Sequence, residues 1–204
     1  MKYVLIETKK IKALEYVFPH HLKNLTDMIL KSGYMTTPLI ITKEHNIVLD
    51  GSHRHIFLLQ QGFKYAPVCY VDYNNNDIRV GTHLMHRHLI EGDKGISKEE
   101  VIKRGITGNL FPPRTTRHFF PFRKIDNIEL SLKDLEKTKP IDVTKNIYNC
   151  SIKSETNHNL RYLHEIEEEV DEIIRYLWEI RKTKQYLSKQ VELMEKNLDN
   201  SFKR

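Results

Sequence analysis

The chain has 204 residues, of which 39% are hydrophobic and 29% are charged, and its formal net charge at pH 7 is +6. This length accommodates one compact domain and an appendage, and no apolar run reaches the roughly 18 residues of a membrane helix. Because the N-terminal apolar stretch precedes its basic residues, the reverse of a signal peptide, we expect a cytoplasmic protein that makes no membrane contact. The positive charge favours anionic partners, which include nucleotides and nucleic acid.

Strands and helices alternate along the first two thirds of the chain. Apolar runs bounded by turn residues predict strands at 3–7, 38–42, 46–49, 66–73 and 127–131. Helices are predicted at 19–32, 55–61 and 97–104. Pro19 suits a first helical turn, Gly33 suits a helix end, and Ser97 with Glu100 forms a capping box. This order predicts an α/β (α+β) domain over residues 1–137.

The last third of the chain has a different character. Residues 138–157 are polar and rich in turn formers, which predicts a linker or an irregular wrap, and residues 158–204 are strongly helical. From Leu163 to Leu198 the apolar positions alternate in spacing between three and four, with Lys184 at one of them. Such a heptad seam predicts a coiled coil, and a core Lys favours two strands, so we expect a homodimer through this helix. The alternative is a long amphipathic helix that folds back on its own domain.

The segment from Asp50 to Arg54 is the first group of residues that can carry chemistry. It lies at a strand–helix junction, where Gly51 lets backbone N–H groups approach an anion. Ser52 and His53 can donate hydrogen bonds, and Arg54 can bind phosphate oxygens in a bidentate way. Asp50 can hold Mg²⁺ together with a phosphate, because Mg²⁺ prefers few protein carboxylates. The alternative is an Asp-Gly turn beside an exposed Arg.

A second group follows two consecutive prolines. Arg114, Thr115, Thr116, Arg117 and His118 bring together two guanidinium groups, two hydroxyls and an imidazole. Fixed donors of this kind can surround a phosphate or a carboxylate. The alternative is a basic surface loop.

Single residues outside these two groups are less conspicuous. Glu15 has apolar neighbours that can raise its pKa and make it a general base, although the residues alone favour a surface carboxylate. Thr82 and His83 are assigned to nucleotide binding, His83 through stacking or a phosphate contact, with an ordinary surface histidine as the alternative. His83, His86 and His88 lack the Cys or carboxylate that would complete a recognised zinc pattern.

Two stretches carry a resemblance to known proteins. LDGSHRHIFLLQQGFKYAPVCYVDY (49–73) resembles the ParB/sulfiredoxin-like superfamily, whose box has the form Gly-x-x-Arg at a strand–helix junction. FPPRTTRHFFPF (111–122), which follows the helix segment KEEVIKRG, resembles the free serine kinase branch of that superfamily. Together with the N-terminal segment the resemblance covers roughly residues 1–135. It implies a ParB/sulfiredoxin-like core that phosphorylates free L-serine with Mg²⁺ and a nucleotide.

The resemblance also implies roles for residues. Lys12-Ala-Leu-Glu15 matches the segment that carries the catalytic carboxylate, which makes Glu15 the leading general base. Asp50 would lie at Mg²⁺ or at the reactive hydroxyl, and residues 51–54 would hold the nucleotide phosphates. The residues expected to face the amino acid and the transferred phosphate are Arg114, Thr116, Arg117 and His118.

Three departures accompany the match. Ala13 replaces a proline, Ser52 stands where the family often has histidine, and the connection between the two boxes is short. The short connection leaves the donor open between ATP and ADP.

The expected function is therefore transfer of the terminal phosphate of ATP or ADP, with Mg²⁺, to free L-serine. A ParB-like nucleotide-dependent regulator or DNA-binding protein is the main alternative, favoured by the basic charge and the expected dimer. No helix-turn-helix pattern follows the core, so nucleic acid is not an expected partner. A scaffold that acts through its coiled coil is the third interpretation.

Overall fold

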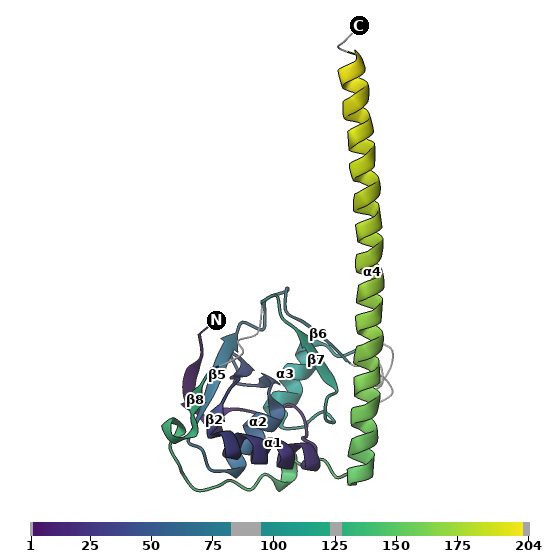
Figure 1. Ribbon diagram of the computed structural model, residues 1–204. Coiled ribbons are helices and arrows are strands. Elements are labelled where there is room, and N and C mark those ends of the chain that lie inside the picture. The colour runs from purple at the N-terminus through teal and green to yellow at the C-terminus, as the bar shows by residue number, and fades with distance from the viewer. Residues whose placement is uncertain (1, 83–94, 123–127, 202–204) are drawn as a thin grey trace. The chain divides into compact units, whose positions relative to one another are not determined.

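The computed structural model describes residues 2–82, 95–122 and 128–201, and it divides into two compact units, Met1–Thr156 and Asn157–Arg204 (Figure 1). The helices are α1 (Pro19–Ser32), α2 (Ser52–Gln60), α3 (Lys98–Thr107) and α4 (Ile152–Ser201), with 3-10 turns η1 (Thr8–Lys10), η3 (Leu132–Leu135) and η4 (Thr144–Asn146). The strands are β1 (Val4–Glu7), β2 (Tyr34–Met35), β3 (Leu39–Thr42), β4 (Val48–Asp50), β5 (Tyr65–Val71), β6 (Arg79–Thr82), β7 (Thr116–Phe119) and β8 (Leu130–Ser131). Mixed α/β architecture is thus confirmed for the first unit.

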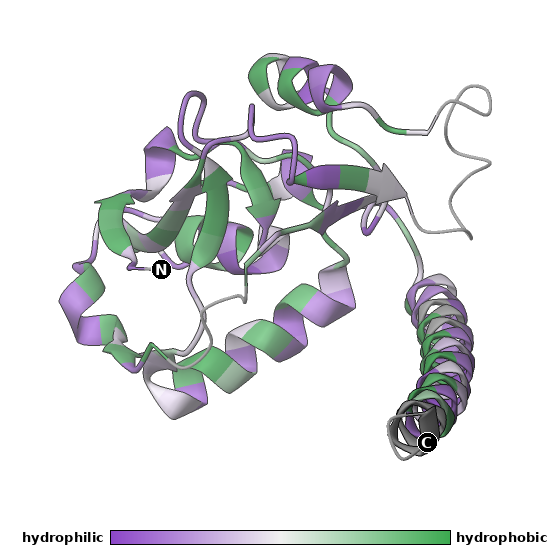
Figure 2. Cartoon of the chain, turned by 90° about the horizontal axis from the view of Figure 1, so that it is seen from above, coloured by the Kyte–Doolittle hydropathy of each residue, from purple (hydrophilic) through white to green (hydrophobic). Residues whose placement is uncertain are grey.

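A four-stranded mixed sheet forms the centre of this unit, in the order β1-β5-β3-β4. β3 runs parallel to β5, while β1 and β4 run antiparallel to their neighbours. β6 pairs with β7 and β2 pairs with β8, each as a separate antiparallel ribbon. The central strands are largely hydrophobic in sequence (Figure 2), as expected for a sheet that is covered on both faces.

Side-chain alternation in β3 divides the interior into two hydrophobic clusters. Leu39 and Ile41 point into one cluster, which also contains residues of α1 and α2, including Leu22 and Phe57. Ile40 points into the other, which contains Val101 of α3. Because successive strand residues face opposite sides, the sheet lies between α1 and α2 on one face and α3 on the other.

Local signals set the ends of two helices as predicted. α1 begins at Pro19 and ends at Gly33, which has the left-handed φ of 76° that favours glycine at a helix end. α3 begins after Ser97, whose side chain accepts a hydrogen bond from the backbone N–H of Glu100. Ser97 therefore sets the start of α3 as its N-cap, while the Glu100 carboxylate accepts a hydrogen bond from Nε of Arg104.

α2 begins three residues earlier than expected, at Ser52 instead of residue 55. Gly51 turns the chain with a φ of 99°, so the helix starts directly after β4. A Cβ at this position would lie 2.7 Å from Cδ2 of Leu39, which leaves no room for a larger residue. Ser52, His53 and Arg54 consequently form the first turn of the helix instead of preceding it.

Residues 138–151 contact the core, within the range 138–157 for which the sequence predicted a linker or an irregular wrap. Val143 is buried in the cluster beneath α1 and α2, and Ile147 pairs with Val17. α4 begins at Ile152, inside the range expected to be irregular, because Ser151 caps it by accepting a hydrogen bond from the N–H of Ser154. Because this stretch is mostly polar, its sequence did not reveal that a few apolar residues, such as Val143 and Ile147, pack against the core.

α4 is one continuous helix of 50 residues. Many apolar residues of this helix are exposed, among them Val170, Leu177 and Val191, which are between 48% and 57% accessible. Among the described residues, no helix combines the length and apolar composition needed to cross a bilayer. A coiled coil stays a prediction at this point, because a single chain shows only one strand of it.

The packing of α3 against Ile47, the residue before β4, yields a stability prediction. A Cβ on the buried Gly105 would lie 2.6–2.7 Å from three side-chain atoms of Ile47. Gly105→Ala should lower the free energy of unfolding, because overpacking costs about 1–3 kcal/mol and better helix propensity returns only about 1 kcal/mol. Urea denaturation beside Ile106→Ala, an exposed neighbour expected to change little, measures this. A more stable Gly105→Ala variant would contradict the packing.

Candidate active site

The segment 11–18 holds Glu15 in place by backbone pairing at three points. Lys12 pairs with Ile47, Glu15 with Phe111, and Val17 with Ile147. At the central point, the N–H of Phe111 donates to the carbonyl of Leu14, and the N–H of Tyr16 donates to the carbonyl of Phe111, both at 2.9 Å. We call residues 11–18 the strap. It sets Glu15 directly beside the loop that begins at Pro112.

The Glu15 carboxylate is buried and accepts three hydrogen bonds from that loop. Oε1 accepts from the backbone N–H of Thr116 at 2.6 Å and from its hydroxyl at 2.7 Å. Oε2 accepts from the backbone N–H of Arg114 at 3.2 Å. Burial raises the pKa of Glu15 from 4.5 to about 7, against the opposing effects of the Thr116 hydroxyl, the two N–H groups and the Arg114 charge. The carboxyl group is therefore set to exchange a proton near neutral pH.

A tight turn aims these donors at Glu15. Arg114 has a left-handed φ of 57°, which is uncommon for a residue with a side chain. The Thr115 hydroxyl donates to the carbonyl of Pro112 at 2.8 Å, and Thr115 is fully buried. Thr115 was predicted to contact substrate, but its hydroxyl is used to close the turn.

The β6–β7 ribbon brings Thr82 and His118 to the side on which Thr116 binds Glu15. Thr82 lies opposite Thr116, the residue that binds Glu15. His118, two residues along the same face of β7, bonds through Nε2 to the Tyr73 hydroxyl at 2.9 Å. Arg117 faces the other side of the ribbon, where its guanidinium lies 5.0 Å from the centre of the Phe119 ring. Strand alternation thus groups Thr82, Thr116 and His118 on the Glu15 side and separates Arg117 from them.

The strand–helix junction carries the other predicted group. Asp50 ends β4 with its side chain one third exposed, and its Oδ2 lies 3.7 Å from Nη2 of Arg54. Nη1 of Arg54 donates to the carbonyls of Thr37 and Pro38, at 2.8 and 2.9 Å. The N-cap residue of α2 is Gly51, which has no side chain to cap the helix. The positive end of the helix is therefore open at the junction of β4 with α2. Asp50, Arg54 and the first turn of α2 therefore lie together at this junction.

His53 has a different position from the one expected. Its Nε2 accepts a hydrogen bond from the backbone N–H of Phe18 at 3.0 Å, so this nitrogen carries no proton. Burial, followed by the charges of His21, Arg114 and Arg54, lowers the pKa of His53 to about 3. The neutral ring joins the strap to α2 and cannot present this nitrogen as a phosphate donor.

Phe18 lies between the group that contains Arg114 and the group at the start of α2. The Arg114 guanidinium lies 6.0 Å from the centre of the Phe18 ring, and Phe18 is bonded to His53 in α2. Phe18 and Tyr73 position site residues, and sequence reasoning missed both because each resembles an ordinary apolar core residue. His83 lies outside the described residues.

The fold and sequence can now be compared with known proteins. No family model matches the chain. The structure has the fold of a free serine kinase variant in complex with ADP, with a TM-score of 0.58, 19% identity, and 67% of this chain covering 95% of that one. A free serine kinase in complex with AMP gives a TM-score of 0.57 at 20% identity, with coverage of 67% and 94%. These likenesses define the class of fold and confirm the expected architecture.

Curated relatives share sequence with part of the chain. The ATP-dependent L-serine kinase of Staphylothermus marinus is 30% identical over 107 residues, which are 50% of this chain and 41% of the relative. The ADP-dependent L-serine kinase SerK of Thermococcus kodakarensis is 31% identical over 108 residues, 51% and 43% of the two chains. A ParB-like protein of Sulfolobus acidocaldarius is 30% identical over 77 residues, 33% and 39%. The chain is thus related in sequence to L-serine kinases, and it spans less than half the length of the curated kinases it matches.

The raised pKa of Glu15 predicts a pH-dependent stability. Between about pH 4.5 and 7 the folded state keeps a proton on Glu15 that the unfolded state has released, so the contribution of Glu15 to stability is fully present below pH 4.5 and falls as pH rises through 7. This one group contributes a slope of at most about 1.4 kcal/mol per pH unit. In Glu15→Gln that component should be missing, as measured by urea denaturation of both proteins from pH 4 to 8. Parallel stability curves would mean that Glu15 titrates normally.

Proposed function

We propose that this chain is a small-molecule kinase that transfers the terminal phosphate of ATP or ADP to the hydroxyl of free L-serine, giving O-phospho-L-serine. The observation that carries the proposal is the buried Glu15 carboxylate with its pKa raised to about 7, held by the turn that contains Arg114 and Thr116. The kinship with L-serine kinases supports serine as the acceptor.

Glu15 is proposed as the general base. Oε1 already accepts two hydrogen bonds from Thr116, whereas Oε2 accepts one longer bond from Arg114 among the described residues. Oε2 therefore keeps a lone pair for the serine hydroxyl. As the serine hydroxyl oxygen forms a bond to the terminal phosphorus, the bond between that phosphorus and the leaving nucleotide breaks. The hydroxyl proton passes to Glu15. The protein's part is positioning and charge neutralisation, as in phosphoryl transfer generally.

The nucleotide phosphates are proposed to lie at the start of α2. Gly51 permits close backbone approach, Ser52 begins the helix, and Arg54 supplies positive charge. Asp50 fits a Mg²⁺ site shared with phosphate oxygens, since its carboxylate is partly exposed beside that helix end. Mg²⁺ would supply neutralisation of phosphate charge. A reaction that uses ATP or ADP also fits the cytoplasmic location expected from the sequence.

The acceptor is proposed to lie along the Glu15 side of the β6–β7 ribbon. Arg114 can bind the serine carboxylate, and Thr116 and His118 border the same side. Thr82 lies opposite Thr116 and is placed to contact either substrate. A contact by Arg117 would have to reach around the ribbon edge, so we assign it to the rim.

Loss of the base should abolish most of the turnover. Glu15→Gln should lower the rate of phosphoserine formation by about 10²–10⁴-fold, the usual worth of general-base assistance, with nucleotide affinity kept within a few fold. ³¹P NMR with ATP or ADP, Mg²⁺ and a panel of free hydroxy amino acids measures transfer. Glu44→Gln, an exposed carboxylate in the β3–β4 turn, is the matched control.

Two outcomes would count against this function. Near-normal transfer by Glu15→Gln would remove Glu15 as the base. Nucleotide binding by the wild type without transfer to any acceptor would favour a ParB-like nucleotide-dependent regulator, in line with the ParB-like relative.

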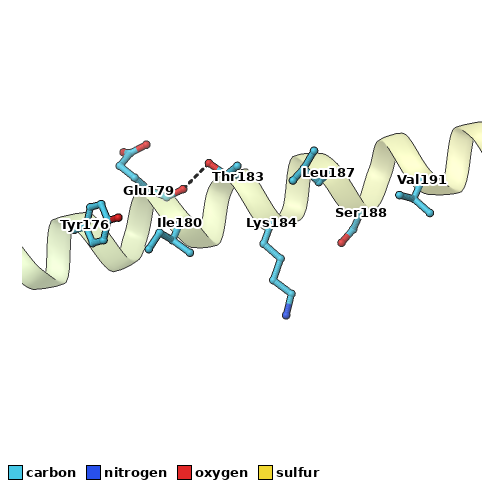
Figure 3. A pocket seen from close by; sticks show the side chains of 8 residues that line it. All are labelled: Tyr176, Glu179, Ile180, Thr183, Lys184, Leu187, Ser188 and Val191. Atoms are coloured by element: carbon cyan, nitrogen blue, oxygen red, sulfur yellow. Dashed lines mark hydrogen bonds between the residues drawn. The ribbon is translucent and has the colours of Figure 1, made fainter. Parts of the chain in front are cut away.

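We also propose that α4 pairs two copies of the chain. Ile180, Lys184, Leu187 and Val191 follow the predicted seam and line one hollow of the helix surface together with Tyr176 (Figure 3). Ile180, Leu187 and Val191 are 48–55% exposed, which is costly for apolar side chains unless another surface covers them. A second α4 presents the same heptad spacing and is the matching partner.

A charge in the seam should separate the copies. Ile180→Lys should convert a dimer to a monomer, because a second charge near Lys184 cannot be buried between helices. Tyr186→Lys replaces another exposed apolar residue, 63% accessible, that lies off the seam and should leave the dimer intact. Sedimentation equilibrium of the full chain distinguishes them. A monomeric wild type, or equal behaviour of the two variants, would contradict pairing through this seam.

A further inference from the structure

Glu155 is a buried carboxylate at the start of α4, with only 1% of its surface exposed. Its Oε2 accepts a hydrogen bond from the backbone N–H of His20 at 2.9 Å, and its Oε1 accepts one from the N–H of His21 at 2.6 Å. These N–H groups belong to the first turn of α1, whose N-cap residue, Phe18, provides no side-chain cap. A residue 135 positions away therefore caps α1 and places negative charge at its positive end.

The segment before Glu155 fixes the same region from a second direction. The N–H of Val17 donates to the carbonyl of Asn146, and the N–H of Tyr148 donates to the carbonyl of Val17, both at 2.9 Å. The Tyr148 ring packs edge-on against Phe18, with 6.1 Å between ring centres. Residues 146–155 thus hold the chain on both sides of Phe18.

Phe18 in turn connects this junction to the proposed site. Its N–H donates to Nε2 of His53, which lies in the first turn of α2 beside Gly51. The rings of His21 and His53 also pack edge-on, 4.5 Å apart. Glu15 lies three residues before Phe18 on the strap. A shift of the first turn of α1 would therefore move both Glu15 and the start of α2.

We propose that Glu155 is a positioning residue for phosphate transfer: by capping α1 it fixes Phe18, and through Phe18 it aligns Glu15 with the phosphate-binding turn of α2. The inference rests on the proposed kinase function. Glu155 touches neither substrate in this account and acts only through the backbone N–H groups of His20 and His21.

The free-energy cost of unpaired N–H groups explains why the loss of Glu155 should affect more than the first turn of α1. Removing Glu155 leaves two N–H groups without their acceptor in a partly buried corner, and such groups cost free energy unless the backbone moves to find water. The backbone that directly precedes these groups is the junction of the strap with α1 at Phe18. Glu155→Gln keeps the shape and one acceptor oxygen, so it should be affected less than Glu155→Ala.

Hydrogen exchange tests the link without depending on activity. In Glu155→Ala, exchange should speed up at least tenfold at the amide of Phe18 as well as at His20 and His21, with a smaller change in Glu155→Gln. Glu168→Ala removes an exposed carboxylate of the same helix and should leave all three amides unchanged. Faster exchange at His20 and His21 with an unaltered Phe18 amide would limit Glu155 to a local cap and overturn the proposal.

Kinetics then test the positioning role. Glu155→Ala should lower kcat for phosphoserine formation at least tenfold with KM for the nucleotide within threefold, and Glu155→Gln should recover part of kcat. Leu135→Ala, a truncation of a fully buried core residue in η3, serves as the control that loses stability while keeping Glu155 and its hydrogen bonds to α1. It should keep kcat within threefold under conditions where both variants are folded.

The outcomes separate the two claims. Equal kcat for Glu155→Ala and wild type would overturn the positioning role while leaving the kinase function intact. A wild type without transfer to any acceptor would remove the kinase function, and the exchange pattern at Phe18 would still decide whether Glu155 holds the junction.

Discussion

The burial of one carboxylate beside two backbone N–H groups and one hydroxyl that bond to it is the constraint on which the proposed site depends. Glu15 can stay in an apolar setting only because Thr116 and Arg114 supply hydrogen bonds to it. Burial and hydrogen bonding oppose each other, and burial prevails, which leaves the pKa of Glu15 near neutrality. A carboxyl group in that range can take a proton from an alcohol and return it to water.

The surrounding architecture serves to keep this arrangement in place. The strap is anchored to Ile47, Phe111 and Ile147, which belong to three separate parts of the first unit. Thr115 closes the turn that presents the donors, and Tyr73 fixes His118 on the same side of the ribbon. The site is thus assembled from segments far apart in sequence, each held by backbone pairing or by a buried hydrogen bond.

Sequence reasoning succeeded where local chemistry decides the structure. Pro19 and Gly33 mark the ends of α1, and Ser97 caps α3, because each signal acts within one helical turn. The start of α2 was placed too late, since Gly51 turns the chain directly from β4 into the helix with a left-handed φ of 99°. Periodicity also gave the extent of α4 approximately, and its start at Ile152 depended on contacts made by the preceding segment.

Pairing over long sequence distances escaped prediction. β6 and β7 have four residues each, which is too short for the sequence alone to indicate that they pair. Their register places Arg117 away from Glu15. The bond from Phe18 to His53 spans 35 positions, and that from His21 to Glu155 spans 134. Neither leaves a periodic trace. The resemblance identified Glu15, whereas the residues alone favoured an exposed carboxylate at that position.

The measurement that tests the account most directly is the titration of Glu15 in the free protein. The side-chain carboxyl carbon can be followed by ¹³C NMR from pH 3 to 9, with Glu15→Gln used to assign its resonance. The account predicts a midpoint at about 7. A midpoint near the ordinary value of 4.5 would show that Glu15 is solvated, and it would contradict both the buried site and the base proposed for it.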